Sequence, residues 1–222
     1  MSAKELTKRW ALFVIGLFFS GIGVAITRRG TLGVSPISSV PNIVSIKWTF
    51  WSFGTWLMLG NILMLIAQIV ILRKKFKIVN LLQIPLSFLF GWFTDFGVFM
   101  SQIIPGDIYF WRMFCVILGT ATLGFGIAIQ VVGDVILNSG EALVKAIADT
   151  IHKEFSNVKI VFDITCVTTS IIISFIFFGK VVGAREGTII AAICTGIAVQ
   201  IFLPLIRKPL TKFIGAGNAQ KE

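Results

Sequence analysis

The chain has 222 residues, of which 56% are hydrophobic and 14% charged, and its formal net charge is +10. Soluble domains contain about 45–50% apolar and about 25% charged residues, so this composition and a mean hydropathy of +0.92 exclude an ordinary soluble protein. The basic residues flank apolar runs and form no basic folded domain. This pattern favours contact with anionic lipid headgroups at the cytoplasmic face and excludes nucleic-acid binding.

Six apolar runs have about the length that a helix needs to cross a bilayer, which is about 20 residues. They cover residues 10–26, 50–72, 78–104, 109–132, 158–178 and 187–206. The first run resembles a signal peptide, but Thr27-Arg28-Arg29 follows it in place of a small-residue cleavage site, so we count it as a span. The sequence therefore predicts an all-α integral membrane protein, with one membrane domain over residues 1–222.

Lysine and arginine are divided unevenly between the two sides of this predicted bundle. With the N-terminus in the cytoplasm, fourteen of them fall on the cytoplasmic side, including Lys221, and six on the other, including Arg185. Cytoplasmic loops carry the excess of basic residues, so we expect both termini in the cytoplasm and residues 207–222 as a cytoplasmic tail. The predicted location is the plasma membrane.

Two connections, 31–47 and 133–157, are too short or too polar to span the bilayer, yet they carry apolar residues. We expect a short helix in each. Pro41 should break the first, and the second should be amphipathic over residues 139–155. The sequence leaves open whether these helices re-enter the membrane or lie at its interface.

Both short helices have a recognisable start. Ser35 precedes Pro36, which is favoured at the first helical position, and Asn138 precedes Ser139 and stands three residues before Glu141, as in a capping box. Helix N-termini expose unpaired N–H groups with partial positive charge, which bind anions or carbonyl oxygens. These five residues are therefore candidates for solute binding; caps that serve stability alone are the equal alternative.

A shift of 103 positions aligns the first predicted span with the fourth. Seven residues are identical within 9–30, including the pairs Arg9 and Arg112, Gly16 and Gly119, and Gly23 and Gly126. A weaker match at a shift of 105 pairs Gly91 with Gly196 and Asp95 with Gln200. Repeats of three spans each, at about 9–104 and 109–206, would enter the membrane from opposite sides, as the inverted repeats of secondary transporters do. A duplication that only built a stable bundle is the alternative.

Some polar residues lie inside predicted spans. Asn61 is near the middle of the second span, where its amide needs a partner on another helix or in a water-filled cavity, and we include it among the binding candidates. Asp95 lies within the third span, and such carboxylates often mark ion or proton pathways. Asp95 and its repeat mate Gln200 are therefore the coupling candidates. Asp163 is expected to pair with Lys159, four residues earlier.

The sequence carries no signal for catalysis or metal binding. It contains no nucleophile elbow, Walker A loop or H-E-x-x-H motif, and its three cysteines lie in apolar runs without a C-x-x-C partner. His152, the only histidine, lies on the charged side of the second short helix, where we expect it to be solvated. We therefore expect no enzyme activity, no metal site and no cofactor.

Three short motifs resemble the bacterial YczE/YitT group of membrane proteins. They are Arg9 with Gly16 and Gly21-Ile22-Gly23, Leu32-Gly33-Val34-Ser35-Pro36, and Arg185-Glu186-Gly187-Thr188. Members of this group have a Leu-Gly-x-x-Pro element in each half, whereas the second half here has Val135-Ile136-Leu137-Asn138-Ser139. This departure argues against a fully symmetric site. The resemblance implies a membrane protein and supplies no substrate.

The leading hypothesis is a secondary transporter or permease for a small polar solute, anions included, bound at the interface of the two repeats. The first alternative is a substrate-binding membrane subunit of a multi-component transporter. Its small residues Gly16, Ser20, Gly21 and Ala25 would pack against an energising partner. The second alternative is a structural or assembly protein. The oligomeric state stays open.

Overall fold

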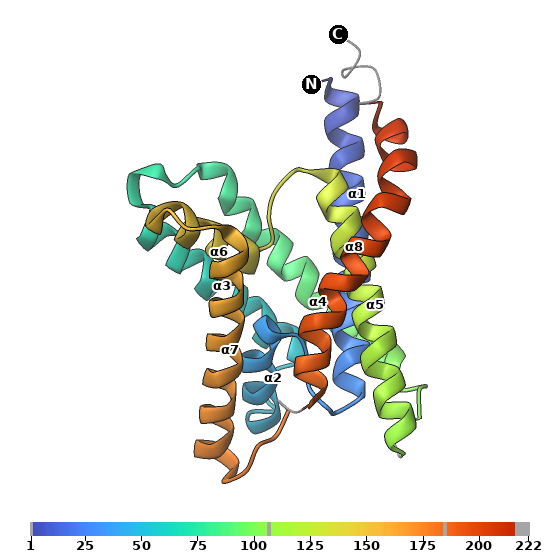
Figure 1. Cartoon of the computed structure of the whole chain (residues 1–222), viewed down its shortest axis with the longest axis vertical. Coiled ribbons are helices and arrows are strands. Elements are labelled where there is room, and N and C mark those ends of the chain that lie inside the picture. Colours follow the sequence, from blue (N-terminus) through green and yellow to red (C-terminus); the bar gives the residue numbers. More distant parts are fainter. Residues whose placement is uncertain (1, 106–107, 184–185, 216–222) are drawn as a thin grey trace.

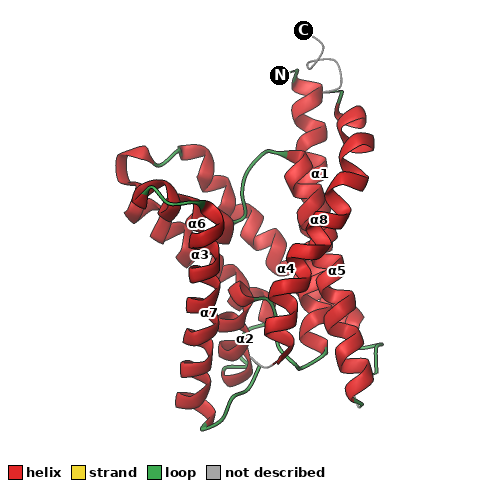
Figure 2. Ribbon diagram, in the orientation of Figure 1, coloured by secondary structure: helices red, strands yellow, loops and turns green. Residues whose placement is uncertain are grey.

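The computed structural model describes residues 2–105, 108–183 and 186–215, and within these it contains helices, turns and loops but no strand (Figure 1; Figure 2). The α-helices are α1 (Ala3–Arg29), α2 (Pro36–Lys47), α3 (Phe53–Leu72), α4 (Gln83–Ser101), α5 (Tyr109–Gly133), α6 (Ser139–Ile151), α7 (Phe155–Phe178) and α8 (Glu186–Ile214). Two 3₁₀ turns, η1 (Arg73–Lys75) and η2 (Ile78–Leu82), connect α3 to α4. The start of α1 and the end of α8 lie at the same end of the molecule (Figure 1).

Six helices of the described chain, α1, α3, α4, α5, α7 and α8, are long and apolar enough to cross a membrane. The prediction of an all-helical protein with six spans is therefore confirmed. The terminal helices are longer than expected, because α1 begins at Ala3 and α8 continues past Pro204 and Pro209 to Ile214. Helix α8 thus includes the first part of the expected tail. Arg185 and Lys221 lie outside the described residues.

Both short helices are present, but two details of their prediction are wrong. Helix α2 is not broken at Pro41. Proline here removes only the N–H that the Ile37 carbonyl would accept, and its ring packs against α3, where a Cβ on Gly60 would lie 3.1 Å from Pro41 Cγ. Helix α6 ends at Ile151 and not at 155, because His152 adopts the left-handed conformation and donates its backbone N–H to Ala148.

Helix α2 is embedded in the protein. The consecutive residues Pro41, Asn42 and Ile43 are all buried although successive helix residues point about 100° apart, whereas a helix at the membrane interface would bury one stripe only. In Figure 1, α2 lies in the half of the molecule away from the termini and α6 in the half nearer to them. The two short helices therefore occupy opposite halves of the bundle.

Helices α1 and α5 pack closely and antiparallel through glycines. A Cβ on Gly16 would lie 2.6 Å from the carbonyl oxygen of Gly126, and a Cβ on Gly23 would lie 2.7 Å from that of Gly119. Residues this small let helix backbones approach closely in a membrane. Since the shift of 103 pairs Gly16 with Gly119 and Gly23 with Gly126, it exchanges the two contacts. A two-fold axis perpendicular to the helices produces such an exchange.

Most other helix contacts also occur as equivalent pairs. The contact of α1 with α4 corresponds to that of α5 with α8. The contact of α2 with α7 corresponds to that of α6 with α3, and the contact of α2 with α3 corresponds to that of α6 with α7. The most extensive contact without a comparable counterpart is that of α3 with α4, because α7 and α8 scarcely touch within the described residues; the smaller contacts of α8 with α1 and α2 lack one too. A Cβ on Gly91 of α4 would lie 2.6 Å from the Gly54 carbonyl oxygen of α3, but Gly196 of α8 has no such neighbour within 4 Å.

Large apolar side chains cover the outer surface of the bundle. Among the exposed ones are Leu63 on α3, Phe99 on α4, Ile176 on α7 and Leu205 on α8. Soluble monomers rarely expose apolar surface on this scale. Hydrocarbon is the solvent that matches it, in agreement with the six spans.

Candidate functional site

A polar cavity of about 90 Å³ lies where α2 and α6 begin, between α1, α3, α4 and α5. A water molecule needs about 10–15 Å³ measured in this way, so the cavity has room for several waters or one small solute. Its polar lining residues are Ser20, Ser35, Ser38, Asn61, Gln83, Ser87, Asn138, Ser139 and Glu141. The fold thus brings five of the six sequence-predicted binding residues to one cavity. Pro36, the sixth, begins α2 but is not part of the lining.

The first turns of α2 and α6 approach each other at this cavity. A Cβ on Gly140 would lie 2.6 Å from Ile37 Cδ1, the end of a flexible side chain, so the two turns are in direct contact. Ser35 and Asn138 are the N-cap residues, as predicted, but neither side chain makes a cap hydrogen bond. Ser35 Oγ donates instead to Ser38 Oγ at 2.9 Å. The predicted capping box of Asn138 and Glu141 is therefore not formed, and neither helix N-terminus at the cavity is capped by the side chain of its N-cap residue. At the start of α2, Pro36 has no N–H, and the Ser38 N–H donates to the Ser35 carbonyl oxygen at 3.0 Å.

Four polar side chains of the lining form no ion pair and no hydrogen bond to another residue within the described chain. They are Asn61, Asn138, Ser139 and Glu141. In particular, Asn61 forms no bond to a neighbouring helix, which the sequence had suggested as one role for it. Buried polar groups are almost always hydrogen-bonded. These groups are therefore available to water or a solute.

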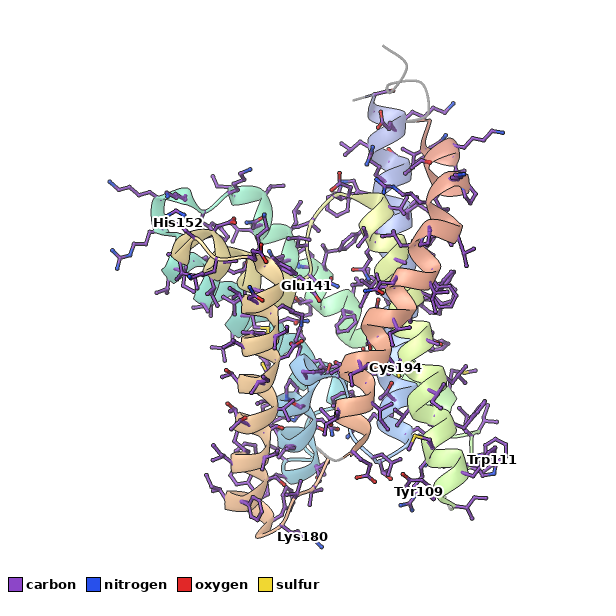
Figure 3. The ribbon with its side chains drawn as sticks, in the orientation of Figure 1. Tyr109, Trp111, Glu141, His152, Lys180 and Cys194 are labelled. Atoms are coloured by element: carbon purple, nitrogen blue, oxygen red, sulfur yellow. The ribbon has the colours of Figure 1, made fainter. Side chains whose placement is uncertain are left out.

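Glu141 lies on the inner side of α6, facing the middle of the molecule (Figure 3). Its side chain is half-buried in the cavity wall. Removal of water by the surrounding protein raises the pKa of the Glu141 carboxyl; Lys159 and a hydrogen bond from its own backbone N–H act in the opposite direction, and Asp163 adds to the increase. The carboxyl is thus disposed to hold a proton at a pH where an ordinary glutamate is ionised.

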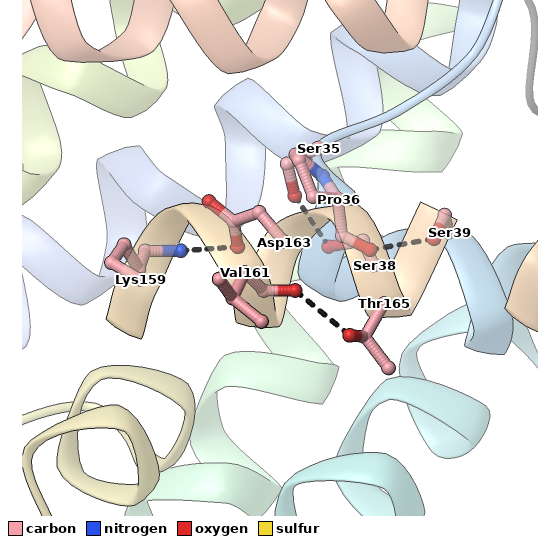
Figure 4. A network of polar contacts seen from close by, with 8 residues as sticks. All are labelled: Ser35, Pro36, Ser38, Ser39, Lys159, Val161, Asp163 and Thr165. Atoms are coloured by element: carbon pink, nitrogen blue, oxygen red, sulfur yellow. Dashed lines mark hydrogen bonds and ion pairs between the residues drawn. The ribbon is translucent and has the colours of Figure 1, made fainter. Parts of the chain in front are cut away.

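Lys159 and Asp163 of α7 form the ion pair that the sequence predicts. The pair lies beside the first turn of α2, which carries Ser35 and Pro36 (Figure 4). Lys159 Nζ donates to Asp163 Oδ1, so this lysine acts on Glu141 through its charge and not through a hydrogen bond. The charge of Lys159 therefore offsets part of the pKa increase that burial causes at Glu141, but not all of it.

Two buried glutamines that the sequence analysis did not select anchor the start of α6. Gln68 and Gln83 exchange two amide hydrogen bonds of 3.1 Å, and Gln68 Nε2 also donates to the Ser139 carbonyl oxygen at 3.1 Å. Gln68 stands seven residues after Asn61, on the same face of α3, and this spacing is the signal that could have identified it. The glutamines tie α3 and α4 to the wall of the cavity.

The coupling candidates lie away from the cavity lining. Asp95 Oδ1 accepts the Gly54 N–H at 2.7 Å and Oδ2 accepts the Ser52 hydroxyl, so this carboxylate of α4 caps the N-terminus of α3. Gln200 of α8 is exposed, and no hydrogen bond of its side chain is seen among the described residues. Asp95 thus fastens α3 to α4 in this conformation, and its repeat mate has no comparable contact.

A second polar cluster lies near Asp95. Arg28 of α1 donates to Asn42 Oδ1 at 3.1 Å and to Ser45 Oγ at 3.0 Å, both on α2, and it stacks over the Phe53 ring of α3. Asn42 Nδ2 in turn donates to the Gly183 carbonyl oxygen at 3.2 Å. These bonds join α1, α2 and α3 to the segment before α8, at the end of the bundle away from the termini.

A larger hollow, of about 540 Å³, lies between α2, α3, α6 and α7 next to the cavity. Its lining is almost entirely apolar and includes Trp48, Trp56 and Phe162. Thr165, one of its few polar residues, donates its hydroxyl to the Val161 carbonyl (Figure 4). A hydrated solute finds no partner there, so the smaller polar cavity is the candidate site. Within the described residues, no three His, Cys, Asp or Glu side chains are grouped to hold a metal ion.

Comparison with known proteins gives a family match. The model of a family of unknown function (DUF6198) matches residues 7–204. A protein from Bacillus subtilis (strain 168), described as uncharacterized protein YyaS, is 23% identical over 204 residues, which are 90% of this chain and 94% of the relative. No solved structure matches. The narrower resemblance to the YczE/YitT group is not confirmed by these matches.

Proposed function

We propose that this chain, which belongs to the family of unknown function DUF6198, is a secondary transporter or permease for a small polar, anionic solute. One observation carries the proposal: two uncapped helix N-termini, from different halves of the chain, meet at one polar cavity among membrane-spanning helices. Helix N-termini attract anions through their free N–H groups and their partial positive charge. Discontinuous helices of this kind bind solutes in secondary transporters.

An inverted repeat of residues 9–104 and 109–206 accounts for the paired contacts. The exchange of the Gly16–Gly126 and Gly23–Gly119 contacts requires an axis perpendicular to α1 and α5, and therefore an axis in the membrane plane if these helices span it. The equivalent packing of α2 on α7 and α6 on α3 has the same origin. Such an arrangement allows two mirrored conformations with similar energies.

The unpaired contact supports alternating access. Helix α3 is closed on α4 through Gly91 and Asp95, whereas α8 stands apart from α7 at Gly196. Closing α7 on α8 and opening α3 from α4 would expose the cavity to the opposite side.

The alternative of a subunit that docks on an energising partner loses its main argument. The small residues that were to form the docking surface are used inside the chain: Gly16 packs on α5, and a Cβ on Gly21 would lie 3.0 Å from Phe93 Cβ of α4. The Ser20 hydroxyl accepts a hydrogen bond of 2.8 Å from Gln130. Lipids, and anionic headgroups near the basic residues, are the partners that the proposal requires.

Flux through proteoliposomes tests the proposal. Purified full-length chain is reconstituted, and uptake of nitrate, lactate and inorganic phosphate is compared with protein-free vesicles. The Asn61→Ala, Asn138→Ala double variant should lose at least tenfold of any flux, because it removes two unpartnered groups from the cavity. Asn157→Ala, at an exposed position on α7, is the matched control and should retain it. Absence of flux for all three anions, or equal flux in the double variant, would overturn the proposal.

A further inference from the structure

Among the described residues that line the cavity, Glu141 alone has an ionisable side chain. The other polar groups there are hydroxyls and amides, which cannot change charge at physiological pH. A cavity with one acid has two electrostatic states. With the carboxylate ionised, it repels anions; with the carboxyl protonated, it is neutral and offers an O–H donor beside the two helix N-termini.

The charged groups around Glu141 do not neutralise it. On α7, Lys159 is paired with Asp163; Lys159 lowers the pKa of Glu141 by more than Asp163 raises it, but by less than burial raises it. On α6 itself, Lys145 is exposed and pairs with Asp149 at 3.8 Å. The cavity residues supplied by α1, α2, α3, α4 and α5 carry no charge. Protonation is therefore the available way to remove the negative charge from the site.

We infer that Glu141 is the proton-binding group of this site, so that one proton and one small monovalent anion occupy the cavity together. This inference rests on the proposed function and adds the coupling ion and the substrate charge to it. The carboxylate takes a proton from water on the side to which the cavity is open, which forms one O–H bond, and the same bond breaks when the proton is released on the other side. The transported pair is neutral overall.

Asp95, the coupling candidate from the sequence, does not fit this role in the structure. Both of its oxygens already accept hydrogen bonds, from the Gly54 N–H and the Ser52 hydroxyl, at the N-terminus of α3. It also lies outside the cavity lining. Asp95 therefore acts as a cap that holds α3 on α4, and the coupling role passes to Glu141.

Infrared titration of the full-length chain in lipid vesicles tests proton binding without any solute. The carbonyl stretch of a protonated carboxylic acid should persist above the ordinary pH range of glutamate in the wild type. It should be lost in Glu141→Gln and retained in Asp95→Asn and in Glu154→Gln, which changes an exposed glutamate at the start of α7. Glu141→Asp should restore a titrating band. If Glu141→Gln leaves the high-pH band unchanged, Glu141 is not the proton site.

Linkage to an anion is measured by adding nitrate or lactate to the same samples. If only the protonated site accepts an anion, the titration midpoint rises with anion concentration, and apparent affinity falls tenfold for each pH unit above the midpoint. In Glu141→Gln the affinity should not depend on pH. A midpoint that neither anion moves would overturn the coupling even if the vesicles transport a solute. A midpoint that moves without any flux would instead contradict the proposed function alone.

Discussion

Alanine substitution at Gly91 and Gly196, which the repeat pairs, should change stability in opposite directions. A Cβ on Gly91 would lie 2.6 Å from the Gly54 carbonyl oxygen, a backbone atom that can move only if α3 shifts. Overpacking of this kind costs about 1–3 kcal/mol, and replacing a helical glycine by alanine returns about 0.5–1 kcal/mol. We expect Gly91→Ala to lose up to about 2.5 kcal/mol. Gly196→Ala meets no atom and should gain about 0.5–1 kcal/mol.

Thermal unfolding of the purified chain measures both effects. For a chain of this length, 1 kcal/mol corresponds to a shift of about 2–4 °C in the midpoint. Gly196→Ala should therefore raise the midpoint by about 1–4 °C, while Gly91→Ala lowers it. If Gly196→Ala lowers the midpoint as much as Gly91→Ala does, then α8 is already packed on a neighbour at this position. The difference between the two helix pairs would then be refuted.

A larger side chain extends the comparison to function. Gly196→Phe is tolerated in the present conformation because the position faces open space. It would overpack a conformation in which α7 closes on α8, by about 1–3 kcal/mol, which reduces the population of that state about 5- to 150-fold. The expected result is a folded protein with flux reduced by that factor. Full flux in Gly196→Phe would show that transport does not require α7 and α8 to close at this glycine.

The remaining predictions concern caps and the cavity acid. Asp95→Asn weakens two hydrogen bonds to a charged acceptor, so the variant should lose about 1–3 kcal/mol of stability in the same unfolding assay. Ser52→Ala removes the 3.1 Å cap bond from the Thr55 N–H and the bond that the hydroxyl donates to Asp95, and should cost about 2–4 kcal/mol. Asn138→Ala should cost less than about 0.5 kcal/mol because its side chain caps nothing. The pKa of Glu141 is higher in the folded protein than in the unfolded chain, so the protonated carboxyl contributes to the stability of the fold. This contribution is complete below the ordinary glutamate pKa and is lost as pH rises through the folded-state pKa. Unfolding midpoints measured against pH should therefore show the midpoint of Glu141→Gln rising relative to that of the wild type as pH increases.

The spans and the short helices could be predicted because their signals are local. Apolar runs of bilayer length identify the spans, and Ser35-Pro36 and the Asn138-to-Glu141 spacing locate the starts of α2 and α6. The prediction of a capping box was wrong because a cap hydrogen bond forms only where the side chain has no better partner in the folded chain. Here Ser35 bonds Ser38, and Asn138 and Glu141 face a cavity that only the folded chain creates.

The roles of polar residues inside the spans could be predicted less well. Depth within a span made Asp95 the natural coupling candidate, but its function depends on α3, whose N-terminus it caps across 41 positions of sequence. The pair of Gln68 and Gln83 likewise depends on tertiary packing, since two amides on different helices can exchange hydrogen bonds only after α3 and α4 pack together. Such pairings require tertiary geometry, which spacing along one helix does not contain.

The two halves also differ in chemistry, and the difference explains why one helix pair is closed. Helix α3 closes on α4 because the Asp95 carboxylate caps its N-terminus, and hydrogen bonds to an ionised acceptor are about twice as strong as neutral ones. If α7 closed on α8 in the equivalent way, the N-terminus of α7 would meet Gln200 of α8, the repeat mate of Asp95, which is a neutral amide. The second closure is therefore weaker than the first. Under the proposed transport function, the empty protein would therefore rest with α3 on α4, and binding of the proton and the anion would have to supply the energy that brings α7 onto α8.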